Sequence, residues 1–120
     1  MTTKFQINYP DITKTATIDI SVDNNTSNVV DLEHMPLAGI YIPSNFDGTQ
    51  FKVLTAPTED GTYVEVQISG EDYTVTTAAS KYVAINDLGI TAGLRFIKIE
   101  TVTNQSGDDT VFTIVRRQIQ

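Results

Sequence analysis

The residue types that carry most protein chemistry are scarce in this sequence. His34 is the single histidine, Glu33 stands beside it, and there is no cysteine. A catalytic triad would need His34 as its base, and no G-x-S-x-G turn or comparable signature accompanies it. Zinc needs three or four nitrogen or sulfur ligands, of which this chain offers one. We therefore expect neither an enzyme nor a cofactor, and we interpret His34 as a loop residue.

Oxygen ligands for calcium are the remaining metal chemistry, and three acidic loops contain them. These loops are DNNTSN at 23–28, TEDG at 58–61 and SGDD at 106–109. None has the spacing of an EF-hand, and Asp, Asn and Gly are also the residues that tight turns require. We interpret all three as turns and predict no metal site.

Positive charge is concentrated at two places in an acidic chain. The stretch GLRFIKIET, residues 93–101, holds Arg95 and Lys98, and Arg116 and Arg117 form an adjacent pair. A net charge of −7 repels phosphate, so we expect neither nucleic acid nor a membrane surface as a partner. We interpret Arg95 as paired with a carboxylate or extended along the sheet surface, with an anion site as the alternative. Arg116 and Arg117 are candidate partner contacts.

The elements that must position these residues are predicted to be strands. Apolar and polar residues alternate in KFQINY (4–9) and TATIDISV (15–22), which is the period of a half-buried strand. Turn clusters rich in Gly and Asp separate the runs, so there is no room for crossover helices. We predict an all-β protein with about nine strands in an antiparallel β-sandwich. The other predicted strands are residues 39–43, 50–55, 62–68, 72–76, 81–86, 94–102 and 110–117.

Alternation breaks in LRFIKIETV, residues 94–102. Leu94, Phe96 and Lys98 fall on one face, while Ile97 and Ile99 fall on the other. Either a bulge shifts the register near Phe96, or the strand is central and both of its faces are largely buried.

The segment DNNTSNVVDLEHMPLAG, residues 23–39, has no clean period and is interpreted as a long connection, with a helical turn considered at 29–35. Residues 1–36 are therefore predicted to form an N-terminal strand segment and joint, and residues 37–120 the sandwich body, within one compact domain. The N-terminal strand, with Phe5, Ile7 and Tyr9 on one face, is either a docking arm or a strand of the chain's own sheet. At 120 residues the chain fits one domain, with no apolar run suited to secretion or to a membrane span.

From Leu37 onward the order of segments resembles small virion proteins of tailed bacteriophages. The resemblance rests on AGI…P at 38–43, DGT at 47–49 and G-x-R-x-I-K-I at 93–99, and covers residues 37–117. The layout is also similar to discoidin-type sandwiches, so the expected architecture is jelly-roll or discoidin-like. Those phage sequences often carry tryptophan where this chain has Asn45 and Phe46, so any role of that aromatic passes to Phe46.

The resemblance implies a structural protein of the bacteriophage virion. Capsid decoration in many copies is the first expectation, and attachment to a tail or head fibre is an alternative. The implied partners are the major capsid protein or another virion protein, and further copies of this chain in a homo-oligomer. Assembly would take place in the host bacterial cytoplasm, which suits a cysteine-free chain. A carbohydrate-binding module, using Tyr41, Phe46 and Tyr63, is the alternative from another class.

Overall fold

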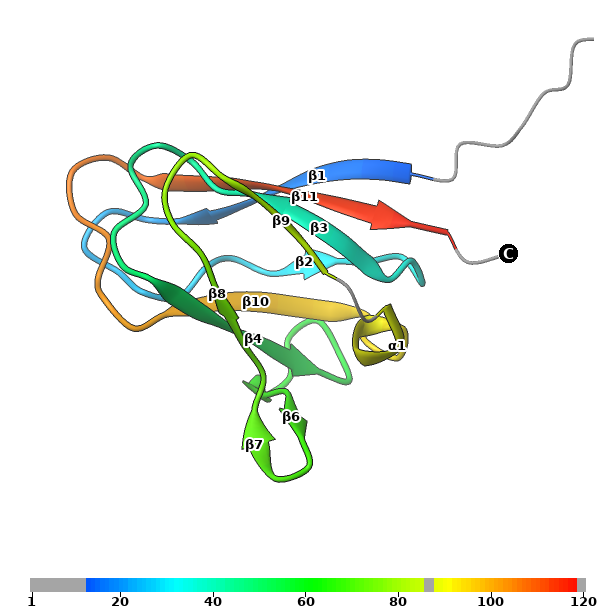
Figure 1. Ribbon diagram of the computed structural model, residues 1–120. Helices are drawn as coiled ribbons and strands as arrows, with labels where there is room; N and C mark the ends of the chain where they lie inside the picture. The colour runs from blue at the N-terminus through cyan, green and yellow to red at the C-terminus, as the bar shows by residue number, and fades with distance from the viewer. Residues whose placement is uncertain (1–12, 86–87, 119–120) are drawn as a thin grey trace, which may run out of the picture.

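The computed structural model describes residues 13–85 and 88–118 and shows two antiparallel sheets packed face to face (Figure 1). The all-β prediction is confirmed, with eleven strands and one helical turn in the described residues. Their bounds are β1 Thr13–Ile20, β2 Val30–Asp31, β3 Leu37–Tyr41, β4 Gln50–Ala56, β5 Val64–Glu65, β6 Gln67–Ile68, β7 Glu71–Asp72, β8 Thr74–Thr76, β9 Tyr82–Ala84, α1 Leu88–Thr91, β10 Phe96–Thr101 and β11 Thr110–Arg117.

The sheet order is that of a jelly roll. Sheet A has the order β1-β11-β3-β9, and sheet B has the order β2-β10-β4, with β5 and β8 both pairing with β4. Strands β1 to β4 alternate between the two sheets along the chain, and so do strands β8 to β11. Crossings of this kind build the two interlocked Greek keys of a jelly roll. The β6–β7 hairpin projects away from sheet B (Figure 1).

The core lies between the two sheets and is built by alternation along each strand. Strand β11 shows this most clearly, because Phe112 and Ile114 are fully buried while Val111 and Arg117 are exposed. Three rings meet at one end of the core, where Phe46, Phe51 and Phe112 lie 5.8 to 6.5 Å apart between ring centroids. Such edge-to-face and tilted contacts add to the energy of burial itself.

The position of strand β10 in its sheet explains why its apolar and polar residues do not alternate strictly. It lies between β2 and β4, and its six residues pair with β4 in one continuous register. Ile97 and Ile99 face the core, while Phe96 is covered on the other side of the sheet. The strand is therefore central with both faces largely covered, and no bulge shifts its pairing with β4.

Two predicted strands are divided in the structure, and one strand was not predicted. Residues 62–68 form β5 and β6, and residues 72–76 form β7 and β8, because the chain leaves sheet B to make the β6–β7 hairpin and then returns to β4. Strand β2 is short, and nothing in its two residues marks it as a strand. The helical turn considered at 29–35 is wrong, since Glu33 and His34 have φ values of 54° and 68°, outside the right-handed helical region.

The segment before residue 37 contributes to both sheets. Strand β1 pairs with β11 over eight residues, and its Ile18 and Ile20 are fully buried. The joint is also fastened to sheet B, because Ser27 Oγ accepts a hydrogen bond from Ile99 N at 2.8 Å. Residues 13–20 thus complete the chain's own sheet. Residues 1–12, which include the predicted strand at 4–9, lie outside the described part. No helix within the described ranges is long and apolar enough to span a membrane.

Candidate interaction face

The outward residues of sheet A form a broad, nearly uncharged surface, which we call face A. Outward positions on β1 and β11 are occupied mainly by threonine and valine, whose branched side chains suit a pleated surface. Three of its side chains are large, apolar and exposed, namely Tyr41 (53%), Tyr82 (47%) and Val111 (42%). Face A consists of Thr13, Thr15, Thr17, Asp19, Gly39, Tyr41, Tyr82, Ala84, Val111, Thr113, Val115 and Arg117.

The two tyrosines of face A are a cross-strand pair. Ile42 N donates to Lys81 O and Ile85 N donates to Ala38 O, so Tyr41 and Tyr82 occupy a non-hydrogen-bonded pair of the β3–β9 ladder. Side chains approach most closely in such pairs. The ring centroids lie 4.6 Å apart.

Gly39 keeps this part of face A flat. Its own position carries no side chain, and the phenol of Tyr82 lies over it, so that a Cβ at residue 39 would overlap the ring. The glycine is buried although it lies on the outer side of β3. The aromatic pair therefore extends across β3 toward β11 instead of standing out from the sheet edge.

Charge is nearly absent from face A. Asp19 and Arg117 are its charged residues, and they lie at opposite ends of the β1–β11 pair, where Asp19 is opposite Val111 and Arg117 is opposite Thr13. The whole chain carries a net charge of −7. A surface of this size with one acid and one base thus differs from the rest of the molecule.

The outer side of sheet B, called face B, has the opposite character. It is formed by Lys52, Leu54, Ala56, Phe96, Lys98 and Glu100. Lys52 donates to Asp72 of the β6–β7 hairpin at 2.9 Å, and Lys98 Nζ lies 4.5 Å from the centre of the Tyr63 ring. The two lysines of face B thus have partners within the chain, and its apolar Leu54 is 6% exposed.

Several pKa values on this side reflect those contacts. The Gln67 side-chain amide and then Lys52 lower the pKa of Asp72, while the hydrogen bond to Asp72 raises the pKa of Lys52. Burial, followed by the charges of Glu59 and Asp60, raises the pKa of Tyr63. All of these groups remain in their ordinary charge states near neutral pH.

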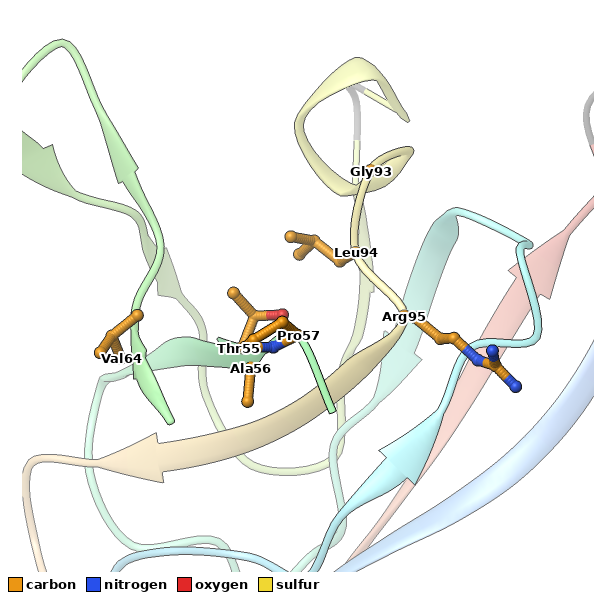
Figure 2. Close-up of a pocket in the computed structure, with 7 residues that line it drawn as sticks. All are labelled: Thr55, Ala56, Pro57, Val64, Gly93, Leu94 and Arg95. Atoms are coloured by element: carbon orange, nitrogen blue, oxygen red, sulfur yellow. The ribbon is translucent and has the colours of Figure 1, made fainter. Parts of the chain in front are cut away.

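A pocket of about 280 Å³ opens beside β4 and β10 (Figure 2). Its walls are mainly apolar, and the Arg95 side chain extends away from the other lining residues (Figure 2). The guanidinium instead pairs with Asp31 at 3.3 Å and lies over the Phe96 ring. The predicted carboxylate partner of Arg95 is therefore found. The lining residues are Thr55, Ala56, Pro57, Val64, Gly93, Leu94 and Arg95.

The predicted partner-binding residues that the structure describes, Phe46, Arg116 and Arg117, do not share one surface. Phe46 is 6% exposed and packs in the core, so its ring is used inside the chain. Arg117 is exposed on face A. Phe5, Ile7 and Tyr9 lie outside the described residues. Binding of a partner by any of these residues stays a prediction.

Arg116 is buried and joins three segments of the chain. Its Nη1 donates to Glu33 at 2.6 Å and to Asp31 O at 3.1 Å, and its Nη2 donates to Thr15 O at 3.3 Å. Its Nε is buried without a hydrogen-bond partner among the described residues. Arg116 thus fastens the turn after β2 to the exposed edge of β1, which the sequence did not indicate.

Two carboxylates at the loop 106–109 accept hydrogen bonds from protein donors. Asp109 accepts from Val22 N at 2.8 Å, and Asp47 accepts from both the N and the Oγ of Ser106 at 3.0 Å. In the described part of the chain, no three His, Cys, Asp or Glu side chains gather as a metal site would require. His34 is exposed in the turn after β2.

Comparisons with known proteins give one structural likeness. No protein-family model matches the chain, and no curated protein matches it. The crystal structure of SPBc2 prophage-derived protein YomS is similar, with a TM-score of 0.52, 17% sequence identity, and coverage of 92% of this chain and 99% of that one. At this identity the likeness shows a shared fold, which extends over nearly the whole of both chains.

Proposed function

We propose that this chain is a structural protein of a bacteriophage particle, and that it decorates the capsid in many copies. The observation that carries the proposal is face A, a nearly uncharged and partly apolar surface on an otherwise acidic jelly roll. Exposed apolar patches bordered by polar residues mark surfaces that other proteins cover. The protein acts by assembly, without catalysis or a bound cofactor.

The phage setting is supported by two independent likenesses. The sequence segments from residue 37 onward resemble small virion proteins, and the fold is shared with a protein described as prophage-derived. Jelly rolls are also widely used in viral capsids. Localisation in the virion after assembly in the bacterial host follows from this proposal, and attachment at a tail or head fibre is the alternative location.

Attachment to the particle is assigned to the predicted strand at 4–9, with Phe5, Ile7 and Tyr9, which precedes β1 in the sequence. A strand added to the sheet edge of a capsid protein would gain affinity from main-chain hydrogen bonds and specificity from alternate side chains. Many weak contacts suffice on a lattice, because each bound copy raises the effective concentration of the next contact.

Mass spectrometry of purified particles from a phage that encodes this chain tests the proposal. We expect the chain in many copies per particle, and we expect the purified protein to co-sediment with particles that lack it. Deletion of residues 2–12 should abolish co-sedimentation while the jelly roll still melts cooperatively. Absence of the chain from particles, together with no co-sedimentation, would overturn the virion role.

Glycan binding is a second candidate, which the exposed pair of Tyr41 and Tyr82 favours. Aromatic faces can stack on sugar rings, and these two are large, exposed and adjacent. A glycan array distinguishes the candidates: binding that is lost in Tyr82→Ala would support this function over decoration. Of the other aromatics considered for sugar stacking, Phe46 is buried and Tyr63 is covered by Lys98.

A further inference from the structure

We propose that a second copy of this chain covers face A, so that two jelly rolls pack through their A sheets in a symmetric dimer. This inference rests on the proposed assembly role and names the partner at its principal surface. The charge distribution carries it. Two copies with a net charge of −7 each repel one another, and a contact through face A brings only one acidic side chain of each copy, Asp19, into the interface.

The shape of face A suits another sheet. Its Thr and Val side chains are short and branched, and the Tyr82 ring lies across Gly39, so the surface is even. Sheets pack about 10 Å apart with their strands rotated by about 30°. Four strands with eight-residue β1 and β11 give a footprint of at most roughly 19 by 27 Å, from the usual spacings of strands and residues.

This footprint, at most roughly 510 Å² from those spacings, lies below the range of standard specific interfaces, which bury about 600 Å² or more per partner. We therefore expect a Kd of about 10 µM in solution. Attachment of neighbouring copies to a lattice would raise their effective concentration and complete the association. A weak dimer that becomes stable on the particle fits a protein that must remain dispersed before assembly.

The two charged residues define the symmetry. Asp19 and Arg117 lie at opposite ends of the paired strands β1 and β11. A two-fold axis between the two faces and perpendicular to the strands places Asp19 of each copy near Arg117 of the other. An axis along the strands instead places Asp19 of both copies at one end of the interface and Arg117 of both at the other. The first arrangement is therefore the one proposed, because it is isologous and complementary in charge.

Sedimentation equilibrium of the full chain, from about 1 µM to 1 mM, tests this arrangement across the expected Kd. Val111→Lys should raise the dimer Kd about tenfold, because it adds a buried charge to the interface. Val102→Lys is the matched control, since Val102 is 65% exposed in the β10–β11 connection and lies outside face A. Its Kd should equal that of the unmodified chain. Thr17→Lys repeats the test at an exposed position of β1.

A charge exchange tests the axis. Asp19→Arg alone should weaken the dimer by placing two arginines together, and the double variant Asp19→Arg with Arg117→Asp should restore it. A chain that stays monomeric at 1 mM would overturn the proposal, as would a dimer equally sensitive to Val111→Lys and Val102→Lys. Failure of the double variant to recover would overturn the axis. Particle co-sedimentation is measured separately, so loss of the dimer and loss of the virion role are distinguishable.

Discussion

Face A and face B are the two outer surfaces of one sandwich, but they differ in the number and placement of their charged side chains. Face B carries Lys52, Lys98 and Glu100, and its lysines lie against the β6–β7 hairpin and Tyr63. Face A carries Thr and Val between one acid and one base, with an exposed pair of tyrosines. The net charge therefore describes the whole chain and not each of its surfaces. Electrostatic repulsion opposes contact between two copies of the chain less at the nearly uncharged face A than at a strongly acidic surface.

Removal of β1 should have the largest effect, because it takes away one side of face A and part of the core. Deletion of residues 2–22 removes Ile18 and Ile20, each worth about 1.5 to 3 kcal/mol of burial, and exposes the edge of β11. Since small domains are stable by only about 5 to 15 kcal/mol, we expect aggregation or loss of cooperative melting. Gel filtration and thermal melting provide the measurement.

Deletion of residues 2–12 is the control for that experiment, because it leaves β1 intact. Its product should melt cooperatively, close to the full chain. A dispersed, cooperatively melting product without residues 2–22 would instead show that β1 is dispensable for the fold.

The next effect concerns the buried Gln105 side-chain amide, which joins the β3–β4 connection to the β10–β11 connection. Gln105 is fully buried, and its side chain accepts from Asp47 N at 2.8 Å and donates to Asp47 O and Thr103 O at 2.8 and 2.9 Å. Gln105→Ala should cost about 3 kcal/mol in the free energy of unfolding, because it leaves buried backbone groups unpaired. Urea denaturation measures this.

Ser106→Ala is the neighbouring control, since Ser106 is exposed and bonds the same Asp47 from outside. We expect a loss below about 1 kcal/mol. Equal losses in the two variants would contradict the assigned importance of Gln105. Both variants should leave the dimer Kd of the folded protein unchanged, because neither residue lies on face A.

A smaller effect is expected from Gly39→Ala, which alters the surface of face A directly. The new Cβ displaces the Tyr82 ring, so the aromatic pair with Tyr41 is lost at a cost of about 1 kcal/mol. Gly93→Ala is matched, since a Cβ there meets no atom within 4 Å. Urea unfolding should show a loss for residue 39 alone, and near-ultraviolet circular dichroism should report the displaced tyrosine. Unchanged tyrosine signals would contradict the packing of Tyr82 over Gly39.

The sequence predicted the fold class because alternation is a local signal. Strand β11 matches its predicted segment and buries every second residue, and the bounds of β1 and β4 lie within two residues of their predicted segments. Strand β2 escaped prediction because its two residues are held by pairing with β10, about 65 positions away. Residues 62–68 likewise form two strands, β5 and β6, because the chain makes a hairpin before it returns to β4. The local sequence pattern does not indicate that return.

Face A was harder to predict than the core. The alternation along β1 places its threonines on the face that points away from Ile18 and Ile20. The sequence therefore indicates the outward residues of this strand. The pairing of Tyr41 with Tyr82 was not, because it depends on which strands become neighbours in sheet A. Phe46 and Arg116 were chosen as aromatic and basic side chains that could contact a partner, and the tertiary structure buries both. Residue type alone does not distinguish an exposed contact from a buried one.

The smallest effect is expected from the loss of stability at acidic pH, through two carboxylates on the sheet B side. The hydrogen bond from Glu33 N and then Arg95 lower the pKa of Asp31, while Gln67 and then Lys52 lower the pKa of Asp72. A lowered folded pKa adds stability above the ordinary value of 3.8, and that stability is lost as the pH falls through the folded pKa. Asp31→Asn with Asp72→Asn should therefore melt slightly below the parent at pH 7 and at the same temperature near pH 2. Thr17→Val on face A serves as the control, because its difference in melting temperature from the parent should be constant over this range. A difference between the double variant and the parent that persists unchanged to about pH 2 would show that these carboxylates act through their shape and not their charge.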